Sequence, residues 1–181
     1  YQWCLDKGLT FLGNSDLHTL STIDFAFPQG DRRPITLVFA RERTIPAIKE
    51  ALLQRRTAVF AQNTLYGDEQ FLRPLFQASV AVKTPTLTVA PKGRAPLQIH
   101  NRSAVDFELK AAAAVEGITF PEKLTLYAGK TIALEIRTTG TKLESGTTIE
   151  LPYEVTNLKT APAKMLSVKI PFTLIGRKGR S

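Results

Sequence analysis

The second half of the chain alternates apolar and polar residues with a period of two, and this pattern constrains the fold more than any other feature. Six runs carry it: Leu97/Ile99, Phe107/Leu109, Leu124/Leu126, Ile132/Leu134/Ile136, Ile149/Leu151/Tyr153/Val155 and Leu166/Val168/Ile170/Phe172. Successive side chains of a β-strand point to opposite faces, so each run predicts a strand with one face in a core. With residues 86–90 the pattern predicts about seven strands, the number typical of an immunoglobulin-like β-sandwich.

The first eighty residues have a different character, because helix-like and strand-like segments alternate there at short spacing. Residues 9–13 and 57–61 are expected to be strands, and the almost continuously apolar run 35–40 predicts a strand buried on both faces. We therefore interpret residues 1–80 as the C-terminal end of an α/β domain and residues 81–181 as the sandwich. The whole chain is then an α+β protein in two parts.

Helix signals separate these first strands. Three helices are expected: one that ends at Gly8, one that begins after Thr44 and one that begins after Asp68. In the second, Thr44 can cap the N-terminus, and Ile45, Ile48 and Leu52 form an apolar stripe at helical spacing.

The net charge of +8 raises nucleic acid as a partner, so its distribution matters. Residues 81–181 hold fifteen Lys or Arg against eight Asp or Glu, which accounts for +7. Many of these lysines fall at outward positions of the predicted strands, where they protect sheet edges and solvate the surface. Aromatic residues are not interleaved with them, which argues against single-stranded nucleic acid as a ligand.

Composition also excludes other classes. With 43% hydrophobic residues in 181, the chain can build a core. The apolar runs are shorter than the roughly 18 residues of a membrane span. Cys4 is the single cysteine, which excludes an internal disulfide and is expected to be a packed thiol.

The chemically suggestive segment is Gly13-Asn14-Ser15-Asp16-Leu17-His18. A carboxylate and an imidazole two residues apart on extended backbone project to the same side, where both can bind one cation such as Zn, Mn or Fe. A catalytic zinc site needs three protein ligands, and the chain has only one other histidine, His100. Because the sequence also starts at Tyr1 without Met, we expect a C-terminal part of a longer protein, with further ligands and any export signal upstream.

These residues resemble the end of the polymerase and histidinol phosphatase (PHP) family of metal-dependent phosphoesterases. The resemblance covers roughly residues 1–62 and rests on the Ser-Asp-x-His motif, the segment 36–40, and Ile48-Lys49-Glu50-Ala51-Leu52 followed by Arg55-Arg56-Thr57. It is closer still to a phosphodiesterase-like branch that carries an extra C-terminal β domain.

The resemblance implies a distorted α/β barrel, of which residues 1–80 would be the remnant, and a centre of two or three divalent metal ions (Mn, Zn or Fe). Asp16 and His18 would be two of its ligands, and the substrate would be a phosphate mono- or diester. Arg32 and Arg33, in the loop after the motif, are candidates for binding the phosphate.

Other interpretations remain open from the residues. A lone Asp-x-His also occurs by chance, with the aspartate in a turn and the histidine exposed. His100 is expected to be structural or exposed, and Asn101-Arg102-Ser103 matches a glycosylation acceptor only as a frequent chance pattern. The alternative function is a non-catalytic sandwich that binds a partner, with the α/β remnant as a scaffold.

Overall fold

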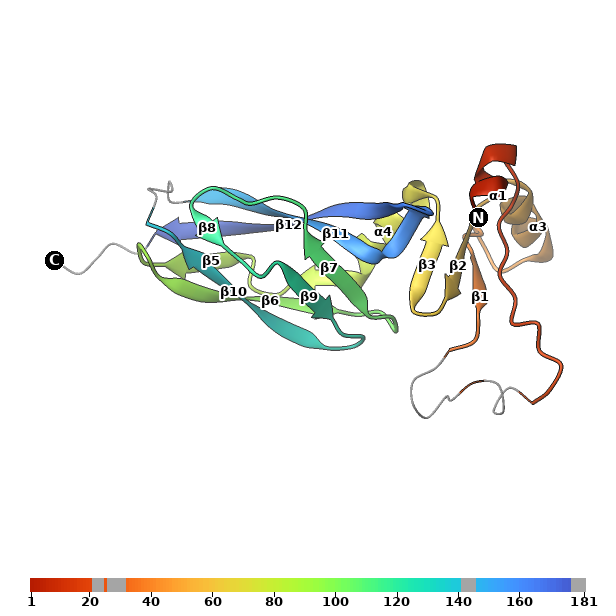
Figure 1. Cartoon of the computed structure of the whole chain (residues 1–181), viewed down its shortest axis with the longest axis horizontal. Coiled ribbons are helices and arrows are strands. Elements are labelled where there is room, and N and C mark those ends of the chain that lie inside the picture. Colours follow the sequence, from red (N-terminus) through yellow and green to blue (C-terminus); the bar gives the residue numbers. More distant parts are fainter. Residues whose placement is uncertain (21–24, 26–31, 141–145, 177–181) are drawn as a thin grey trace. The chain divides into compact units, whose positions relative to one another are not determined.

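The computed structural model describes residues 1–20, 25, 32–140 and 146–176 (Figure 1). The helices are α1 (Gln2–Lys7), α3 (Ile45–Leu53) and α4 (Glu69–Ser79). The strands are β1 (Ile35–Val38), β2 (Thr57–Ala61), β3 (Thr64–Gly67), β4 (Val80–Val82), β5 (Thr86–Val89), β6 (Arg94–Asn101), β7 (Phe107–Ala111), β8 (Ile118–Thr119), β9 (Lys123–Leu126), β10 (Thr131–Thr138), β11 (Thr147–Ala161) and β12 (Lys164–Gly176). None of the helices in these ranges has the length and apolar character of a membrane-spanning segment.

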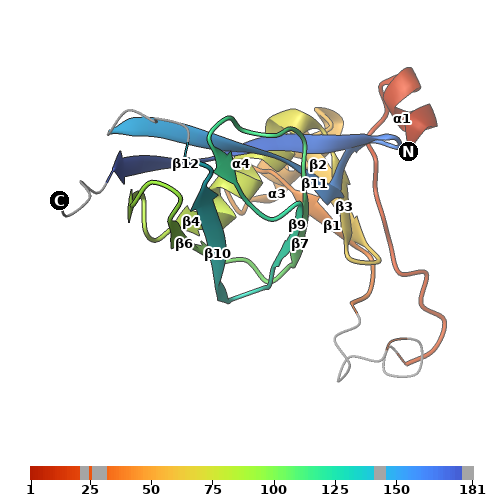
Figure 2. The same cartoon turned by 60° about the vertical axis from the view of Figure 1, so that its left-hand side comes forward.

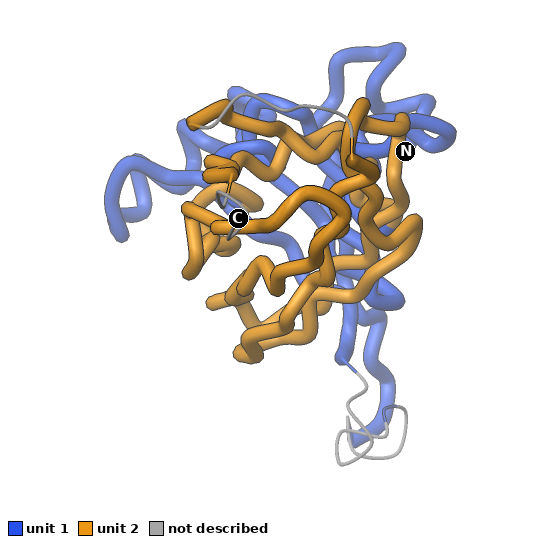
Figure 3. Tube along the Cα trace, turned by 90° about the vertical axis from the view of Figure 1, so that its left-hand side faces the viewer, with its two compact units in different colours: residues 1–75, 157–166 blue, residues 76–156, 167–181 orange. Residues whose placement is uncertain are grey.

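The chain divides into two compact units (Figure 3). Unit 1 contains residues 1–75 and 157–166, and unit 2 contains residues 76–156 and 167–181. The long hairpin of β11 and β12, visible in Figure 2, therefore contributes its tip to unit 1 and its stem to unit 2. The expected boundary between residues 80 and 81 stays a prediction.

Unit 2 has the expected β-rich, immunoglobulin-like character. One sheet has the order β4-β6-β10-β8, and the other contains β5, β7, β9 and the stems of β11 and β12. The alternating runs place one side chain in two in the core, as in the cross-strand pair Leu134↔Leu97. Both members of this pair are buried, and the other sheet supplies buried Phe107, Tyr153 and Phe172. All the runs predicted from the alternation are strands.

Unit 1 contains three short strands of the eight-stranded sheet. Strands β1, β2 and β3 pair antiparallel in that order, and β3 pairs in parallel with the tip of β11 through Leu65↔Leu158. Strand β3 was not predicted. It forms a hairpin with β2 through Gln62 and Asn63, whose φ angles of 49° and 55° suit the tight turn that such a hairpin requires.

One strand predicted for unit 1 is absent, and the burial predicted for another was wrong. Residues 9–13 are not a strand: they form an extended strap that threonine side chains hydrogen-bond to β1 and β2. Thr57 donates to the carbonyl of Phe11 (2.9 Å), and Thr36 exchanges bonds of 3.0 Å with both backbone groups of Gly13. Strand β1 was expected to be buried on both faces, but Ile35 at its start is exposed and its other residues are only partly buried.

The helix termini predicted at Gly8, Thr44 and Asp68 were correct, but the predicted buried face of α3 was not. Gly8 ends α1 in the left-handed conformation, Thr44 accepts a bond from the amide of Ala47, and Asp68 accepts one from the amide of Gln70. In α3 the buried residues are Ala47 and Ala51, whose small side chains let the helix backbone approach its neighbours. The larger side chains of the Ile45 stripe are displaced toward solvent.

The barrel remnant is not shown by this architecture. Strands β1, β2 and β3 pair antiparallel, whereas a parallel α/β barrel pairs its strands in one direction. The described chain is mostly β-sheet, with three helices among the described residues.

Candidate metal-binding site

Asp16 and His18 lie together at the end of the strap. The Asp16 carboxylate oxygen Oδ1 is 3.4 Å from Nε2 of His18, and both side chains are almost fully exposed. The pair brings a hard oxygen donor and an imidazole nitrogen to one place on the surface, which fits part of the ligand set of a divalent metal ion.

The backbone conformation that brings Asp16 and His18 together differs from the one expected. Extended backbone would have placed the two side chains on one side, but Asp16 has φ 48°, in the left-handed region that few non-glycine residues adopt. The chain turns there, and the turn brings the imidazole back toward the carboxylate. Backbone of this kind costs free energy and often occurs at functional positions.

The strap fixes the position of this turn. Thr10 Oγ1 donates to the carbonyl of Leu52 at the end of α3 (2.5 Å), and Gly13 lies directly against Val59 of β2. A Cβ atom added to Gly13 would be 2.3 Å from Val59 Cγ1, so only glycine permits this close approach.

Aromatic rings anchor the other end of the strap. Tyr1 and Phe11 are 4.8 Å apart between ring centroids, and Tyr66 of β3 meets both rings edge-on. The Tyr1 hydroxyl donates to the carbonyl of Thr160 (2.9 Å). Burial, with the nearby Asp68 carboxylate, raises the pKa of Tyr1 to about 12. Tyr1 is therefore a neutral donor at physiological pH.

The described residues do not complete a metal centre. No cluster of three His, Cys, Asp or Glu side chains with metal-binding spacing occurs among them. Arg32 and Arg33 are exposed just before β1, and the structure records no contact of either with Asp16 or His18. Their role in phosphate binding stays a prediction, as do the roles of Asp16 and His18 as ligands.

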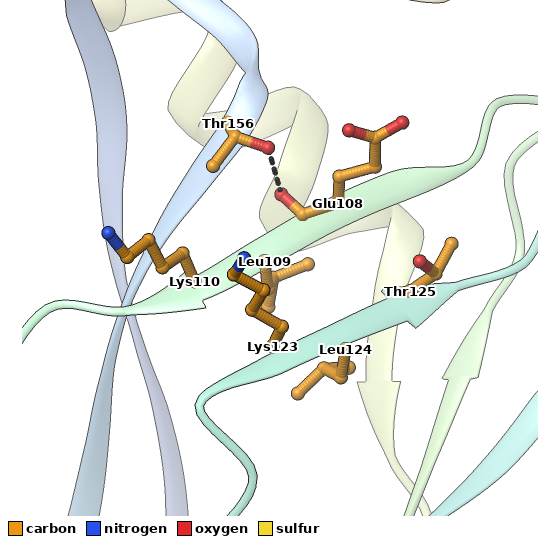
Figure 4. Close-up of a pocket in the computed structure, with 7 residues that line it drawn as sticks. All are labelled: Glu108, Leu109, Lys110, Lys123, Leu124, Thr125 and Thr156. Atoms are coloured by element: carbon orange, nitrogen blue, oxygen red, sulfur yellow. Dashed lines mark hydrogen bonds between the residues drawn. The ribbon is translucent and has the colours of Figure 1, made fainter.

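A second candidate is a shallow hollow of about 620 Å³ on the outer face of β7 and β9 (Figure 4). Glu108, Lys110, Lys123, Thr125 and Thr156 supply its polar groups. The amino groups of the two lysines point in different directions, and the single hydrogen bond drawn joins the Thr156 hydroxyl to the backbone carbonyl of Glu108 (3.2 Å). These groups do not converge on one point, so the hollow has the character of a solvated sheet surface.

The histidine and asparagine of β6 have structural roles. His100 Nδ1 lies 3.0 Å from the Thr131 hydroxyl on the neighbouring strand. Asn101 is completely buried: its amide donates to the carbonyls of Val105 and Leu126 (2.8 Å each), and its oxygen accepts from the amide and hydroxyl of Ser103. In the folded domain Asn101 is inaccessible as a glycosylation acceptor.

Sequence reasoning missed the role of Gly13 and Asn101. The proximity of Gly13 to Val59 depends on a contact between distant segments, which no local pattern encodes. For Asn101 one signal was present: the residue continues the inward side of the alternation Leu97, Ile99, so it falls on a buried position.

Residues 80–171 match the family described as "DUF5001: Ig-like domain", which is about half of the chain. The chain belongs to the DUF5001 family. This assignment agrees with the two packed sheets of unit 2, and it says nothing about residues 1–79. A search of curated proteins gave no match.

Solved structures extend the comparison. The chain is similar to a two-domain protein from Bacteroides vulgatus that contains a predicted PHP-like metal-dependent phosphoesterase, with 33% identity and a TM-score of 0.83. The match covers 94% of this chain and 48% of that one, so this chain spans about half the length of that protein. Because 94% is covered, most of residues 1–79 match as well.

Two chaperones give much weaker matches. The periplasmic chaperone SfaE is 13% identical (55% of this chain, 58% of that chain, TM-score 0.39), and the E. coli chaperone DraB is 15% identical (55% of each chain, TM-score 0.38). At such TM-scores neither carries an argument about this DUF5001 chain.

Proposed function

We propose that this chain belongs to a PHP-like metal-dependent phosphoesterase, to which it supplies two metal ligands, Asp16 and His18. The reaction is hydrolysis of a phosphate mono- or diester, and residues 81–181 are the accessory sandwich. The observation that carries the proposal is the 3.4 Å proximity of this carboxylate and imidazole, in a chain 33% identical to the Bacteroides vulgatus protein. This chain spans about half the length of that protein. We therefore assign the activity to a polypeptide longer than residues 1–181.

Each residue has a defined task in this proposal. Asp16 offers a hard anionic oxygen, and His18 offers the imidazole nitrogen Nε2. In the free chain the two groups face one another, and both are open to an incoming cation. Divalent ions such as Mn, Zn or Fe, when bound, lower the pKa of water and neutralise charge on the phosphate.

The left-handed turn at Asp16 orients the pair. Its backbone strain is offset by the threonine hydrogen bonds and the Gly13 contact that hold the strap, so the pair is positioned before a metal arrives. Arg32 and Arg33, exposed in the same unit, are assigned to the phosphate oxygens.

The test uses the polypeptide as the cell makes it, assayed on a generic phosphomonoester and a phosphodiester with and without added Mn, Zn or Fe. We expect metal-dependent hydrolysis, and we expect Asp16→Ala and His18→Ala each to lower it by at least about 100-fold. Asp6→Ala and His100→Ala are the matched controls. Asp6 is exposed on α1, and His100 on β6 lies beside Thr131, so neither belongs to the Asp16–His18 pair.

The fold of each variant is checked by its thermal unfolding. Activity that is unchanged in both Asp16→Ala and His18→Ala removes these residues from the site. A protein without any metal-dependent hydrolysis favours the alternative, a non-catalytic sandwich that binds a partner.

A further inference from the structure

The tip of the β11–β12 hairpin, residues 157–166, belongs to unit 1. The DUF5001 match, residues 80–171, nevertheless includes these residues, so the family description counts them as part of the Ig-like domain. In the structure the tip adds a parallel strand next to β3, through the pair Leu158↔Leu65. A segment that belongs to the sandwich by sequence is therefore part of the unit that carries the candidate metal ligands.

Both strands of the tip are attached to unit 1. On β11, Leu158 is completely buried, and the side-chain amide of Asn157 donates to the carbonyl of Asn63 in the β2–β3 turn (2.9 Å). On β12, Lys164 pairs with Glu69 at the start of α4 (3.3 Å). A buried leucine, a buried amide and an ion pair thus hold the tip from separate directions.

The tip also holds two aromatic rings that contact the strap at Phe11. The Tyr1 hydroxyl donates to the carbonyl of Thr160 (2.9 Å), and the Tyr1 ring centroid lies 4.8 Å from that of Phe11. Tyr66 is the strand partner of Lys159, and its ring meets Phe11 edge-on at 6.5 Å. Aromatic pairs with these geometries attract one another beyond the effect of burial. Each ring therefore connects the tip to the strap.

The position of the metal ligands depends on how the strap is held. Threonine side chains fix the strap backbone at the carbonyl of Phe11 and at Gly13, and the two rings fix the Phe11 side chain. Asp16 and His18 follow on the same segment and are almost fully exposed, so little packing of their own holds them. Their position is set by the anchored residues that precede them.

We propose that the hairpin tip is a positioning element for the metal ligands: through Tyr1 and Tyr66 it holds Phe11, and thereby the strap that presents Asp16 and His18. The role in metal binding rests on the proposed function, whereas the attachment of the strap to the tip does not. Tyr1 is a positioning residue, because it acts through Phe11. The sandwich thus contributes to the metal site through its longest hairpin.

The experiment removes the bond between Tyr1 and the tip but keeps the aromatic ring, with the variant Tyr1→Phe. Tyr153→Phe is the matched control, because the Tyr153 hydroxyl also donates to a backbone carbonyl, that of Pro121 (2.8 Å), and both residues lie in unit 2. Each variant loses one hydroxyl and one hydrogen bond to a carbonyl. Asn157→Ala, which removes the bond to Asn63, is a second probe of the tip.

Two quantities are measured in the polypeptide as the cell makes it. The first is the solvent-exchange rate of the Gly13 amide, which donates to the Thr36 hydroxyl (3.0 Å) and is followed by NMR with isotope-labelled glycine. The second is the dissociation constant for Mn, obtained on the metal-free protein from the electron paramagnetic resonance signal of the free ion. Thermal unfolding establishes that each variant is folded.

We expect Tyr1→Phe and Asn157→Ala to accelerate exchange at Gly13 by about three- to ten-fold, the range that corresponds to the loss of one hydrogen bond. We expect both variants to weaken Mn binding by at least about three-fold for the same reason. Tyr153→Phe should leave both quantities unchanged. A general loss of stability would affect the Tyr1→Phe and Tyr153→Phe variants alike, so the difference between them isolates positioning.

Unchanged exchange at Gly13 in both Tyr1→Phe and Asn157→Ala overturns the proposal. Faster exchange with unchanged Mn affinity also overturns it, and so do equal effects of Tyr1→Phe and Tyr153→Phe. Each of these results leaves the proposed function standing if the unmodified protein binds Mn. An unmodified protein that does not bind Mn rejects the proposed function and the role of the tip in metal binding, while the exchange rates still decide whether the tip holds the strap.

Discussion

In unit 2 the apolar residues of nearly every strand are buried, whereas in unit 1 several large apolar residues face solvent. Leu97 of β6 is fully buried between two sheets, while Leu53 at the end of α3 is 84% exposed. Both residues belong to segments with a clear apolar pattern. The difference is that each sheet of unit 2 has a second sheet to cover it, and α3 has only the narrow alanine contact. An apolar stripe becomes core only where another layer is available to cover it.

The comparison predicts opposite responses to the same substitution. Leu97→Ala should lower the free energy of unfolding by about 2–5 kcal/mol, because it removes buried methyl groups and leaves a cavity. Leu53→Ala should change it by no more than about 0.5 kcal/mol. Urea unfolding of both variants measures the difference, and equal losses would break the contrast between the units.

Buried polar groups sharpen the comparison for unit 2. Asn101→Ala should cost about 2–3 kcal/mol, because it removes the two hydrogen bonds that this buried amide donates to the carbonyls of Val105 and Leu126. The control is Gln98→Ala on the same strand, whose side chain is exposed. If the two variants unfolded at the same urea concentration, the hydrogen-bond network around Asn101 would have no role in stability.

The strap of unit 1 is tested at its closest contact. Gly13→Ala should lower stability by about 1–2 kcal/mol, since the added methyl group meets Val59. Val59→Ala in the same chain should recover part of that loss in a double-mutant cycle. Gly176→Ala is the control, because no heavy atom lies within 4 Å of its added Cβ. A cycle without coupling energy would place the strap away from β2.

The smallest effect concerns an ion pair of unit 1. Glu69 accepts from Arg73 (2.6 Å) and pairs with Lys164 (3.3 Å), and these bonds, Arg73 first, hold the pKa of its carboxyl below the ordinary value. A lowered pKa stabilises the fold above the ordinary pKa, and this stabilisation is lost as the pH falls through the folded value. Because the pair is exposed, Glu69→Gln should cost less than about 1 kcal/mol at pH 7.

The pH profile is the measurement for this pair. The difference in unfolding midpoint between the Glu69→Gln variant and the unmodified chain should shrink as the pH falls below the ordinary pKa of a glutamate carboxyl and should disappear once Glu69 is protonated in the folded state as well. Glu150→Gln, which removes the pair with Lys169 in unit 2, is the matched control. A difference that stays constant over this range would show that the carboxylate charge at position 69 is not involved.

Much of unit 2 could be predicted from the sequence, because alternation is a local property that one strand displays by itself. Which strands pair with one another was harder to predict from the sequence. Leu174 of β12 pairs in parallel with Leu87 of β5, and these residues are far apart in the sequence. Neither run contains information on which strand will be its neighbour or on the direction of pairing.

For the candidate site, the sequence identified Asp16 and His18 as a pair. The backbone conformation expected to bring the two side chains together was wrong. The predicted extended backbone is replaced by a left-handed turn at Asp16, which follows a strap that Thr36 of β1 and Thr57 of β2 hold at Gly13 and Phe11. Such a conformation is decided by the surroundings, because the intrinsic preference of aspartate alone does not select it.

The sequence by itself determined where the seven alternating or apolar strands of the sandwich lie, where α1 ends, where α3 and α4 begin, and which two residues have metal-binding chemistry. These features follow from periodicity and capping, which depend on residues close together in the chain. Only the tertiary structure decided that α3 buries its alanines, that residues 9–13 form a strap and that β1, β2 and β3 run antiparallel. Each of these depends on which distant segment is available to cover a surface, and that is a property of the packed molecule.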